Sequence, residues 1–229
     1  PSPLKMAQFI PDENRLLFNN HLDDYDAWKD DHGRPLSVEL AGPREKIFFP
    51  PEQTKAVIAT CGGLCPGIND VIRSITLTLF HRYGVLDIWG ARYGFRGLNP
   101  QCGHSLVKLT PEFVDNITSV GGSILSSSRG PQDIDLMVDF LQKMNFNILF
   151  CIGGDGTMRA ATAIKNKITE RQLKIAVIGI PKTIDNDLDL IQKSFGFDTA
   201  IEKAVEAIKS AHVEAKGSFN GIGLIKIMG

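Results

Sequence analysis

The sequence predicts an α/β protein with a Rossmann-like, mostly parallel sheet that carries helices on both faces. From Lys55 onward, short apolar runs that suit buried strands alternate with longer segments of helical periodicity. Glycine-rich turns follow several of these runs, as is typical of sheets in which helical crossovers connect parallel strands. Ligands of such sheets bind beyond the carboxyl ends of the strands. We therefore expect a ligand site where those turns lie.

The expected elements alternate regularly along this region. Strands are predicted at residues 56–59, 85–89, 123–125, 147–152, 174–180 and 222–227. Helices are predicted at residues 66–83, 110–120, 131–144, 156–166 and 198–213. The first helix has the clearest pattern, because Pro66 suits its first turn and apolar residues recur on one face at Ile68, Val71, Ile72, Ile75 and Leu79.

The first fifty residues have a different character. They are rich in Pro, Asp and Asn, and only residues 25–29 suggest a short helical turn. We expect an extended arm that packs on its own core or on a neighbouring subunit, and a partly ordered tail fits the composition equally well.

Composition indicates an ordinary globular protein without a bulk electrostatic partner. The chain has 229 residues, 43% of them hydrophobic and 22% charged, and a net charge of −1. Neither nucleic acid nor a membrane surface is therefore indicated as a partner. No apolar run suits a spanning helix and residues 1–10 lack signal-peptide features, so a cytoplasmic location is expected. The four cysteines have no histidine at a ligand spacing, and we interpret them as reduced structural thiols: Cys61, Cys65, Cys102 and Cys151.

Two glycine-rich segments indicate binding of an anionic ligand. Residues 61–69, Cys-Gly-Gly-Leu-Cys-Pro-Gly-Ile-Asn, follow a strand and begin a helix, so the backbone can approach a ligand and helix N–H groups can face an anion. They match neither a Walker loop nor the dinucleotide fingerprint. Residues 153–157, Gly-Gly-Asp-Gly-Thr, begin another helix, where phosphates would gain from the helix dipole. Asp155 suits a Mg²⁺ ligand, although an N-cap residue would have the same chemistry.

A third segment, residues 181–187 with the sequence Pro-Lys-Thr-Ile-Asp-Asn-Asp, ends the apolar run 175–180. Residues two apart in an extended segment project to the same side, so Asp185 and Asp187 can address one metal or one sugar hydroxyl together. On its own such a pair is more often a solvated turn. The other two segments make a phosphoryl-transfer site the better interpretation.

Taken together, the three segments resemble the 6-phosphofructokinase family, from about Lys55 to Gly229, with the N-terminal half of the family represented. The most specific element is Pro-x-Thr-Ile-Asp-Asn-Asp about thirty residues after Gly-Gly-Asp-Gly-Thr. The second string also occurs in NAD and diacylglycerol kinases, whereas the segment from Thr183 to Asp187 is not expected there. The resemblance implies an N-terminal extension at residues 1–52, a nucleotide-binding domain at 53–192 and the beginning of a sugar-phosphate domain at 193–229.

The resemblance also implies roles for individual residues. Asp185 matches the general base that takes the proton from the 1-hydroxyl of fructose 6-phosphate, Asp187 the acid that supports it, and Thr183 a hydrogen-bond donor to the transferred phosphoryl group. Substrate contacts are expected at Thr183, Asp185, Met228 and Gly229. Asp155 matches the Mg²⁺ ligand, and Arg129 a catalytic residue that bridges the donor phosphates. Binding of the donor ATP is expected at Gly62, Gly63, Tyr93, Arg129, Gly130, Gly154, Asp155, Gly156 and Thr157.

Two residues bear on the phosphoryl donor and point in opposite directions. Gly156 matches the family's ATP users, because the pyrophosphate users usually carry an aspartate there that crowds the nucleotide's α-phosphate. Lys182 matches the pyrophosphate users, whereas bacterial ATP enzymes have glycine. The pairing is similar to the long-chain ATP-dependent group of plants and trypanosomatids, which derives from the pyrophosphate branch. We expect ATP, because an absent side chain is a precondition for the nucleotide and a lysine can serve either donor.

Several alternatives remain at the level of the sequence. They are a pyrophosphate-dependent phosphofructokinase, a NAD or lipid kinase, and a non-catalytic regulatory subunit, although the last would be free to lose its acidic residues. The family implies an allosteric homotetramer, with glycosome or plastid as alternatives to the cytoplasm. Because the sequence stops within a Met-Gly-Arg motif, we expect these 229 residues alone to bind nucleotide weakly and to lack kinase activity.

Overall fold

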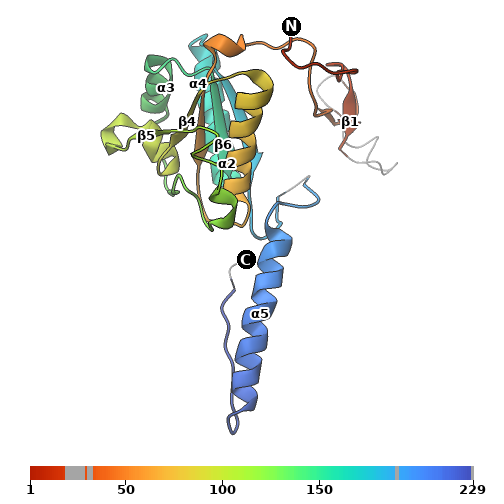
Figure 1. Ribbon diagram of the computed structural model, residues 1–229, viewed down its shortest axis with the longest axis vertical. Coiled ribbons are helices and arrows are strands. Elements are labelled where there is room, and N and C mark those ends of the chain that lie inside the picture. Colours follow the sequence, from red (N-terminus) through yellow and green to blue (C-terminus); the bar gives the residue numbers. More distant parts are fainter. Residues whose placement is uncertain (19–28, 30–32, 189–190, 228–229) are drawn as a thin grey trace. The chain divides into compact units, whose positions relative to one another are not determined.

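The computed structural model describes residues 1–18, 29, 33–188 and 191–227. The chain divides into two compact units, Pro1–Pro50 and Pro51–Gly229, and Figure 1 shows the elements of each. The first unit contains two short antiparallel strands, β1 (Arg15–Leu17) and β2 (Ser37–Glu39). The side chain of Arg15 supports this pairing by donating a 2.9 Å hydrogen bond to the Ser37 hydroxyl. The helical turn predicted at residues 25–29 lies outside the described residues except for Lys29, which forms an isolated bridge with Pro35.

The second unit contains a five-stranded sheet in the order β5-β4-β3-β6-β7. Strands β3 (Lys55–Thr60), β4 (Asp87–Ala91), β6 (Ile148–Gly153) and β7 (Ala176–Pro181) pair in parallel, and β5 (Leu106–Lys108) pairs antiparallel with β4. The chain leaves β3 toward β4 on one side and leaves β6 toward β7 on the other. The topological switch point therefore lies between β3 and β6, where ligands of such sheets bind.

Helices cover both faces of this sheet, as predicted (Figure 1). Helix α2 (Ile68–Leu77) packs on one face with Ile58 of β3, whereas α3 (Ile134–Lys143) and α4 (Asp155–Glu170) pack on the other with Val57 and Ala59. Successive residues of a strand point to opposite faces, so β3 contributes side chains to the hydrophobic core on each face of the sheet. Helix α2 continues as a π-helical segment, η2 (Thr78–Tyr83), which ends at Gly84 with a φ of 75°.

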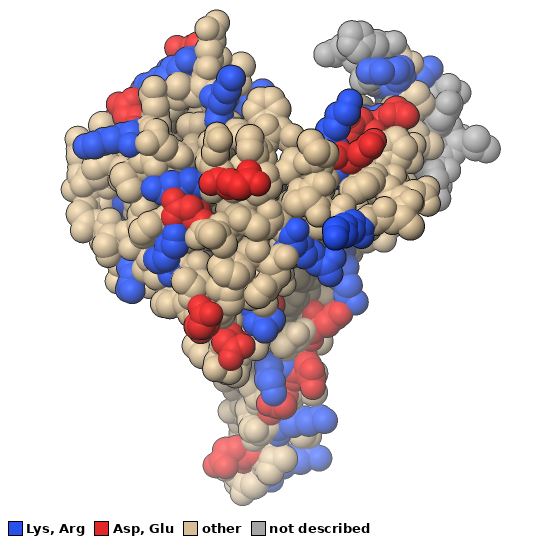
Figure 2. Space-filling view, turned by 45° about the horizontal axis from the view of Figure 1, so that its top comes forward, with Lys and Arg blue, Asp and Glu red and all other residues tan. Residues whose placement is uncertain are grey.

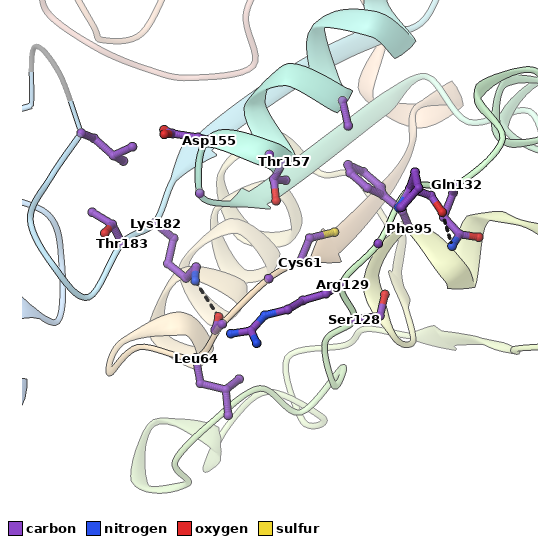
Figure 3. A pocket seen from close by; sticks show the side chains of 18 of the residues that line it. Cys61, Leu64, Phe95, Ser128, Arg129, Gln132, Asp155, Thr157, Lys182 and Thr183 are labelled. Carbon is purple, nitrogen blue, oxygen red and sulfur yellow. Dashed lines mark hydrogen bonds between the residues drawn. The ribbon is translucent and has the colours of Figure 1, made fainter. Parts of the chain in front are cut away.

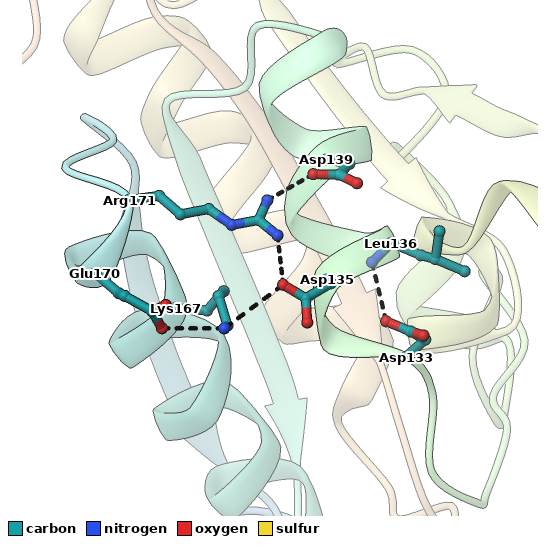
Figure 4. A network of polar contacts seen from close by, with 7 residues as sticks. All are labelled: Asp133, Asp135, Leu136, Asp139, Lys167, Glu170 and Arg171. Carbon is teal, nitrogen blue, oxygen red and sulfur yellow. Dashed lines mark hydrogen bonds and ion pairs between the residues drawn. The ribbon is translucent and has the colours of Figure 1, made fainter.

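An ion-pair network holds α3 against α4 (Figure 4). The guanidinium of Arg171 binds the carboxylates of Asp135 and Asp139, and Lys167 pairs with Asp135 at 3.6 Å and with Glu170 at 3.0 Å. Exposed ion pairs contribute about 1 kcal/mol or less each, so the buried apolar contacts beneath them supply most of the packing energy.

Four short 3₁₀ segments and one long helix complete the described elements. The 3₁₀ segments are η1 (Pro51–Gln53), η3 (Gly94–Leu98), η4 (Pro100–Cys102) and η5 (Ile117–Ser119). Helix α5 (Phe197–Lys216) has no buried residue. Among the described residues, no helix combines the length and the apolar character needed to cross a membrane. On the face shown in Figure 2, acidic and basic side chains are interspersed.

Three predicted elements were wrong. The strand predicted at residues 123–125 is a turn closed by the Ser126 N–H on the Ser123 carbonyl at 2.9 Å, and its apolar character comes from Leu125, which is buried beside Gly90. The helix predicted at 110–120 consists of turns and η5, because Val114 and Ile117 enter the core from a loop.

The strand predicted at residues 222–227 is also absent, and Ile222 and Leu224 are 92% and 93% exposed. Within the described residues this segment pairs with no strand, and apolar alternation alone does not make a strand. The antiparallel edge strand β5 and the hairpin of β1 and β2 were not predicted, because three residues are too short to show a period.

Candidate active site

A pocket of about 790 Å³ lies at the carboxyl ends of β3, β6 and β7 (Figure 3). The loops that follow these strands contribute residues 61–64, 154–157, 182–185, 187 and 188, and the segment before α3 contributes residues 128–132. The pocket thus occupies the topological switch point and brings the three motifs together. The predicted site residues that line it are Gly62, Gly63, Arg129, Gly130, Gly154, Asp155, Gly156, Thr157, Lys182, Thr183, Asp185 and Asp187.

The glycine-rich loop after β3 is fixed by hydrogen bonds from the segment before α3. The Gly62 N–H donates to the Ser128 carbonyl at 3.0 Å, and the Ser127 hydroxyl donates to the Gly62 carbonyl at 2.6 Å. Gly62 has a φ of 83°, a conformation that favours glycine. At Gly63, a Cβ would lie 3.3 Å from the Arg129 guanidinium. The absence of a side chain at Gly63 therefore allows the Arg129 guanidinium to approach the loop.

The loop after β6 opens into α4 without a side-chain cap. Gly154 is the N-cap residue, Asp155 is the first helical residue, and no side-chain hydrogen bond caps the helix. The alternative role of Asp155 as an N-cap residue is therefore not observed, and helix N–H groups are left available to an anionic ligand. A Cβ on Gly153 would lie 2.2 Å from Thr157 Oγ1, whereas a Cβ on Gly156 would meet nothing within 4 Å.

Lys182 connects the loop after β7 to the loop after β3. Its ammonium donates a 2.6 Å hydrogen bond to the Gly63 carbonyl (Figure 3), and its backbone N–H donates to the Gly153 carbonyl at 2.9 Å. The residue is 5% exposed. Burial lowers the pKa of Lys182, and the nearby Arg129 guanidinium lowers it further. Two cations therefore stand at one end of the pocket beside the N-terminus of α4.

Thr183 links the two acids of the third motif. Its hydroxyl donates to the Asp187 carboxylate and accepts the Asp185 N–H at 3.1 Å. Thr183 is 9% exposed, whereas both acids are exposed at the pocket lining. The arrangement holds a carboxylate in the pocket with the two cations, as transfer of an anionic group to a hydroxyl requires.

Three predicted residues are not in the described pocket. Tyr93 does not line it: its ring packs on His104 with a centroid distance of 4.5 Å, and its carbonyl accepts a hydrogen bond from the Ser128 hydroxyl at 2.5 Å. Met228 and Gly229 lie outside the described residues. Their expected roles stay predictions.

The apolar end of the pocket was missed by sequence reasoning. It is lined by Phe95 and the Gln132 amide (Figure 3), and also by Ile134, Met137 and Ala160. Gln132 is oriented by Asn99, whose amide donates to Gln132 Oε1 at 3.1 Å. The apolar periodicity of α3 offered a partial signal, because residues near the start of a helix at a strand end can face the ligand. One end of the pocket is thus cationic and the other apolar.

The acidic residues suit a hard divalent cation carried by a phosphorylated ligand. Within the described part of the chain, no three His, Cys, Asp or Glu residues gather to form a metal site. Mg²⁺ is commonly held by one or two carboxylates together with substrate phosphates. Asp155, exposed at the pocket lining, fits that role.

The buried thiols next to the pocket are suited to packing. Burial raises the pKa of Cys61 to about 12 and also raises the pKa values of Cys65 and Cys151. The thiolate is the nucleophile and the metal ligand, so these groups are neutral and unreactive near neutral pH. All four cysteines are free.

The fold, with the three motifs gathered in one pocket at the carboxyl ends of the strands, defines an α/β protein of the phosphofructokinase type. A family model described as phosphofructokinase matches residues 55–229, and the chain belongs to that family.

Similar curated proteins carry one name. The chain is 49% identical over 223 residues to the ATP-dependent 6-phosphofructokinase of Borreliella burgdorferi, covering 97% of this chain and 49% of that protein. It is 50% identical to the Trypanosoma cruzi protein of the same name, covering 85% of this chain and 40% of that protein. It is 49% identical to ATP-dependent 6-phosphofructokinase 5, chloroplastic, of Arabidopsis thaliana, covering 84% of this chain and 35% of that protein. The chain thus spans half or less of the length of each of these relatives.

Solved structures show the same fold. A pyrophosphate-dependent phosphofructokinase from Marinobacter aquaeolei matches with a TM-score of 0.63 and 19% identity, covering 71% of this chain and 42% of that one. Pichia pastoris phosphofructokinase in the T-state matches with a TM-score of 0.60 and 19% identity, covering 75% of this chain and 19% of that one.

Proposed function

We propose that this chain forms the donor-binding half of an ATP-dependent 6-phosphofructokinase, which transfers the terminal phosphoryl group of ATP to the 1-hydroxyl of fructose 6-phosphate. The observation that carries the proposal is the pocket itself. It places Lys182, Arg129 and the uncapped start of α4 around the same space as Asp185 and Thr183. The names of the three curated relatives support the choice of reaction.

Asp185 has the role of general base. Its backbone is fixed by the hydrogen bond from its N–H to the Thr183 hydroxyl, and its exposed carboxylate can accept the proton of a sugar hydroxyl as that oxygen attacks the phosphoryl group. Phosphoryl transfer depends mostly on positioning and on neutralising charge. Lys182 and Arg129 supply that charge at the donor end of the pocket.

Asp155 would hold a magnesium ion that accompanies the donor. When bound, Mg²⁺ neutralises negative charge on the phosphates. The first turn of α4 gives the protein's own contribution at the same place, because its N–H groups face the pocket with the positive end of the helix dipole.

ATP is favoured over pyrophosphate by the space beside Gly156. A nucleotide needs an apolar surface for its base as well as a cationic end, and the pocket offers both, with Phe95, Ile134 and Met137 at the apolar end. The sequence comparison at Lys182 favoured pyrophosphate. In the structure, the Lys182 ammonium donates a hydrogen bond to the Gly63 carbonyl. Its presence is thus explained by holding the glycine-rich loop, whichever donor binds.

Residues 193–229 belong, in this proposal, to the beginning of the sugar-phosphate domain. Helix α5 carries an apolar stripe at Ile201, Val205 and Ile208, which are 48%, 40% and 46% exposed. Such a stripe is typical of a helix that packs on a core, and this chain covers only 49%, 40% and 35% of the three relatives. Further substrate ligands, homotetramer formation, allosteric control and a location in cytoplasm, glycosome or plastid are proposed by similarity to the family.

A coupled assay of the full-length protein tests the proposed reaction. Fructose 6-phosphate is supplied with Mg²⁺ and either ATP or pyrophosphate, and formation of fructose 1,6-bisphosphate is followed. We expect turnover with ATP and at most a trace with pyrophosphate. Turnover with pyrophosphate alone would contradict the donor, and phosphorylation of NAD or a lipid in place of the sugar would contradict the substrate.

A further inference from the structure

Ser194 holds the backbone of Thr183 from both sides. It lies eleven residues after Thr183 in sequence and is 5% exposed. Its hydroxyl accepts the Thr183 N–H at 3.3 Å and donates to the Thr183 carbonyl at 2.9 Å. One side chain thus satisfies both backbone groups of the residue that links the two acids of the site.

Asn186, which lies between the two acids, binds Ser194 in return. Its side-chain oxygen accepts the Ser194 N–H at 2.6 Å, and its amide donates to the Gln192 carbonyl at 3.3 Å. Asn186 has a φ of 54°, a left-handed conformation that asparagine adopts more readily than most residues. The segment 183–186 is therefore anchored at both of its ends, and Asp185 lies inside it.

The two residues after Ser194 contact the glycine-rich loop that follows β3. The Phe195 carbonyl accepts a hydrogen bond from the Cys65 thiol at 3.0 Å, and a Cβ on Gly67 would lie 3.1 Å from the Phe195 ring. A Cβ on Gly196 would lie 2.1 Å from the Pro66 carbonyl oxygen, so only glycine allows this approach. Residues 194–196 therefore connect the loop that carries Asp185 to the loop that faces the donor.

We propose that Ser194 is a positioning residue for phosphoryl transfer, because its hydroxyl fixes Thr183 and Asp185 relative to the donor-binding loop. The proposal rests on the function proposed above for this pocket. A general base must stay within hydrogen-bond reach of its hydroxyl, and a displacement of about 1 Å can cost roughly a hundredfold in rate. Loss of Ser194 should therefore act on the chemical step and spare binding of the donor.

Steady-state kinetics of full-length Ser194→Ala test this role. We expect kcat to fall roughly ten- to a hundredfold while KM for ATP changes by less than about twofold, and we expect Ser194→Thr, which keeps the hydroxyl, to restore most of kcat. Ser210→Ala is the matched control, because its hydroxyl donates to the Glu206 carbonyl on the exposed helix α5. Normal kcat in Ser194→Ala, with an active wild type, overturns the positioning role alone. No turnover by the wild type overturns the proposed function as well.

Two further variants separate positioning from a loss of folding. Asn186→Gly keeps a residue that tolerates a positive φ and removes the side-chain hydrogen bonds to the Ser194 N–H and to the Gln192 carbonyl, so we expect kcat to fall roughly three- to tenfold at a melting temperature close to that of the wild type. In an Asp185→Asn background, Ser194→Ala should cost nothing further, because residues that act as a unit are not additive. Full additivity of the two losses, or a normal kcat in Asn186→Gly, overturns the proposal.

Discussion

A side chain at the position of Gly156 should be compatible with folding and should interfere with binding of the donor. A Cβ at this position would meet nothing within 4 Å, although the residue lies in the first turn of α4 and lines the pocket. Glycine destabilises a helix by about 0.5–1 kcal/mol relative to alanine, and an acid near a helix N-terminus adds about 0.3–1 kcal/mol. We therefore expect Gly156→Asp to raise the free energy of unfolding by about 0.5–1 kcal/mol, and the melting temperature by about 1–4 °C.

The same substitution should strongly weaken the binding of ATP. Two like charges 4 Å apart repel by about 4 kcal/mol at an effective dielectric constant of about 20. Even half of this repulsion raises KM for ATP roughly thirtyfold. Pyrophosphate, which has no α-phosphate or nucleoside, should be affected less.

Thermal denaturation of the ligand-free, full-length protein and KM for ATP are the two measurements. Gly153→Ala, at the last residue of β6, is the matched control in the same motif. A Cβ there would lie 2.2 Å from Thr157 Oγ1, so overpacking should destabilise the protein by about 1–3 kcal/mol. A loss of stability in Gly156→Asp as large as in Gly153→Ala would refute the reasoning, as would an unchanged KM for ATP.

The other predictions concern the ionisation of Lys182, the reactivity of the cysteine thiols and the activity of the isolated 229 residues. Because burial lowers the pKa of Lys182, this side chain binds fewer protons in the folded than in the unfolded state between that lowered pKa and 10.5, so its own contribution to stability should rise with pH in this window, whereas the buried cysteines, whose pKa values are raised, make stability fall. Denaturant titrations at several alkaline pH values should therefore show that stability falls more steeply with pH in Lys182→Met than in the wild type; equal slopes would contradict the prediction for Lys182. Alkylation by iodoacetamide at pH 8 should label the half-buried Cys102 before the buried cysteines, whose pKa values are raised, and mass spectrometry showing Cys61 labelled first would contradict this order. The isolated 229 residues should bind ATP weakly in calorimetry and produce no fructose 1,6-bisphosphate, and measurable turnover would count against the need for the second half.

The parallel sheet and its motifs were predictable from local signals. A strand, a glycine-rich turn and a helix occur together at residues 55–77 and again at 148–170, so periodicity and turn chemistry agree there. The segment between residues 110 and 125 gave false signals, because Val114 and Leu125 are buried from turns and Ile117 from the three-residue 3₁₀ segment η5. Apolar residues mark burial, and burial does not require a helix or a strand.

The contacts inside the site depended on the tertiary structure. The partner of Lys182 is a backbone carbonyl 119 residues away in sequence, and the partner of Ser194 is a backbone amide. Such bonds leave no pattern in a single sequence, because any residue could supply the backbone group. Phe95 and Gln132 were missed for a related reason: they resemble an ordinary core residue and an ordinary loop residue until the pocket brings them together.

The role of Asp185 is tested most directly by a single-turnover measurement on the full-length protein. Wild type and Asp185→Asn are mixed with ATP, Mg²⁺ and fructose 6-phosphate, and formation of the sugar bisphosphate is followed, with the Kd for ATP measured in parallel. We predict that the rate of transfer falls by roughly 10²- to 10⁴-fold while the Kd for ATP stays within about twofold. A near-normal rate in Asp185→Asn would contradict the assignment of the general base, and with it the account of this pocket.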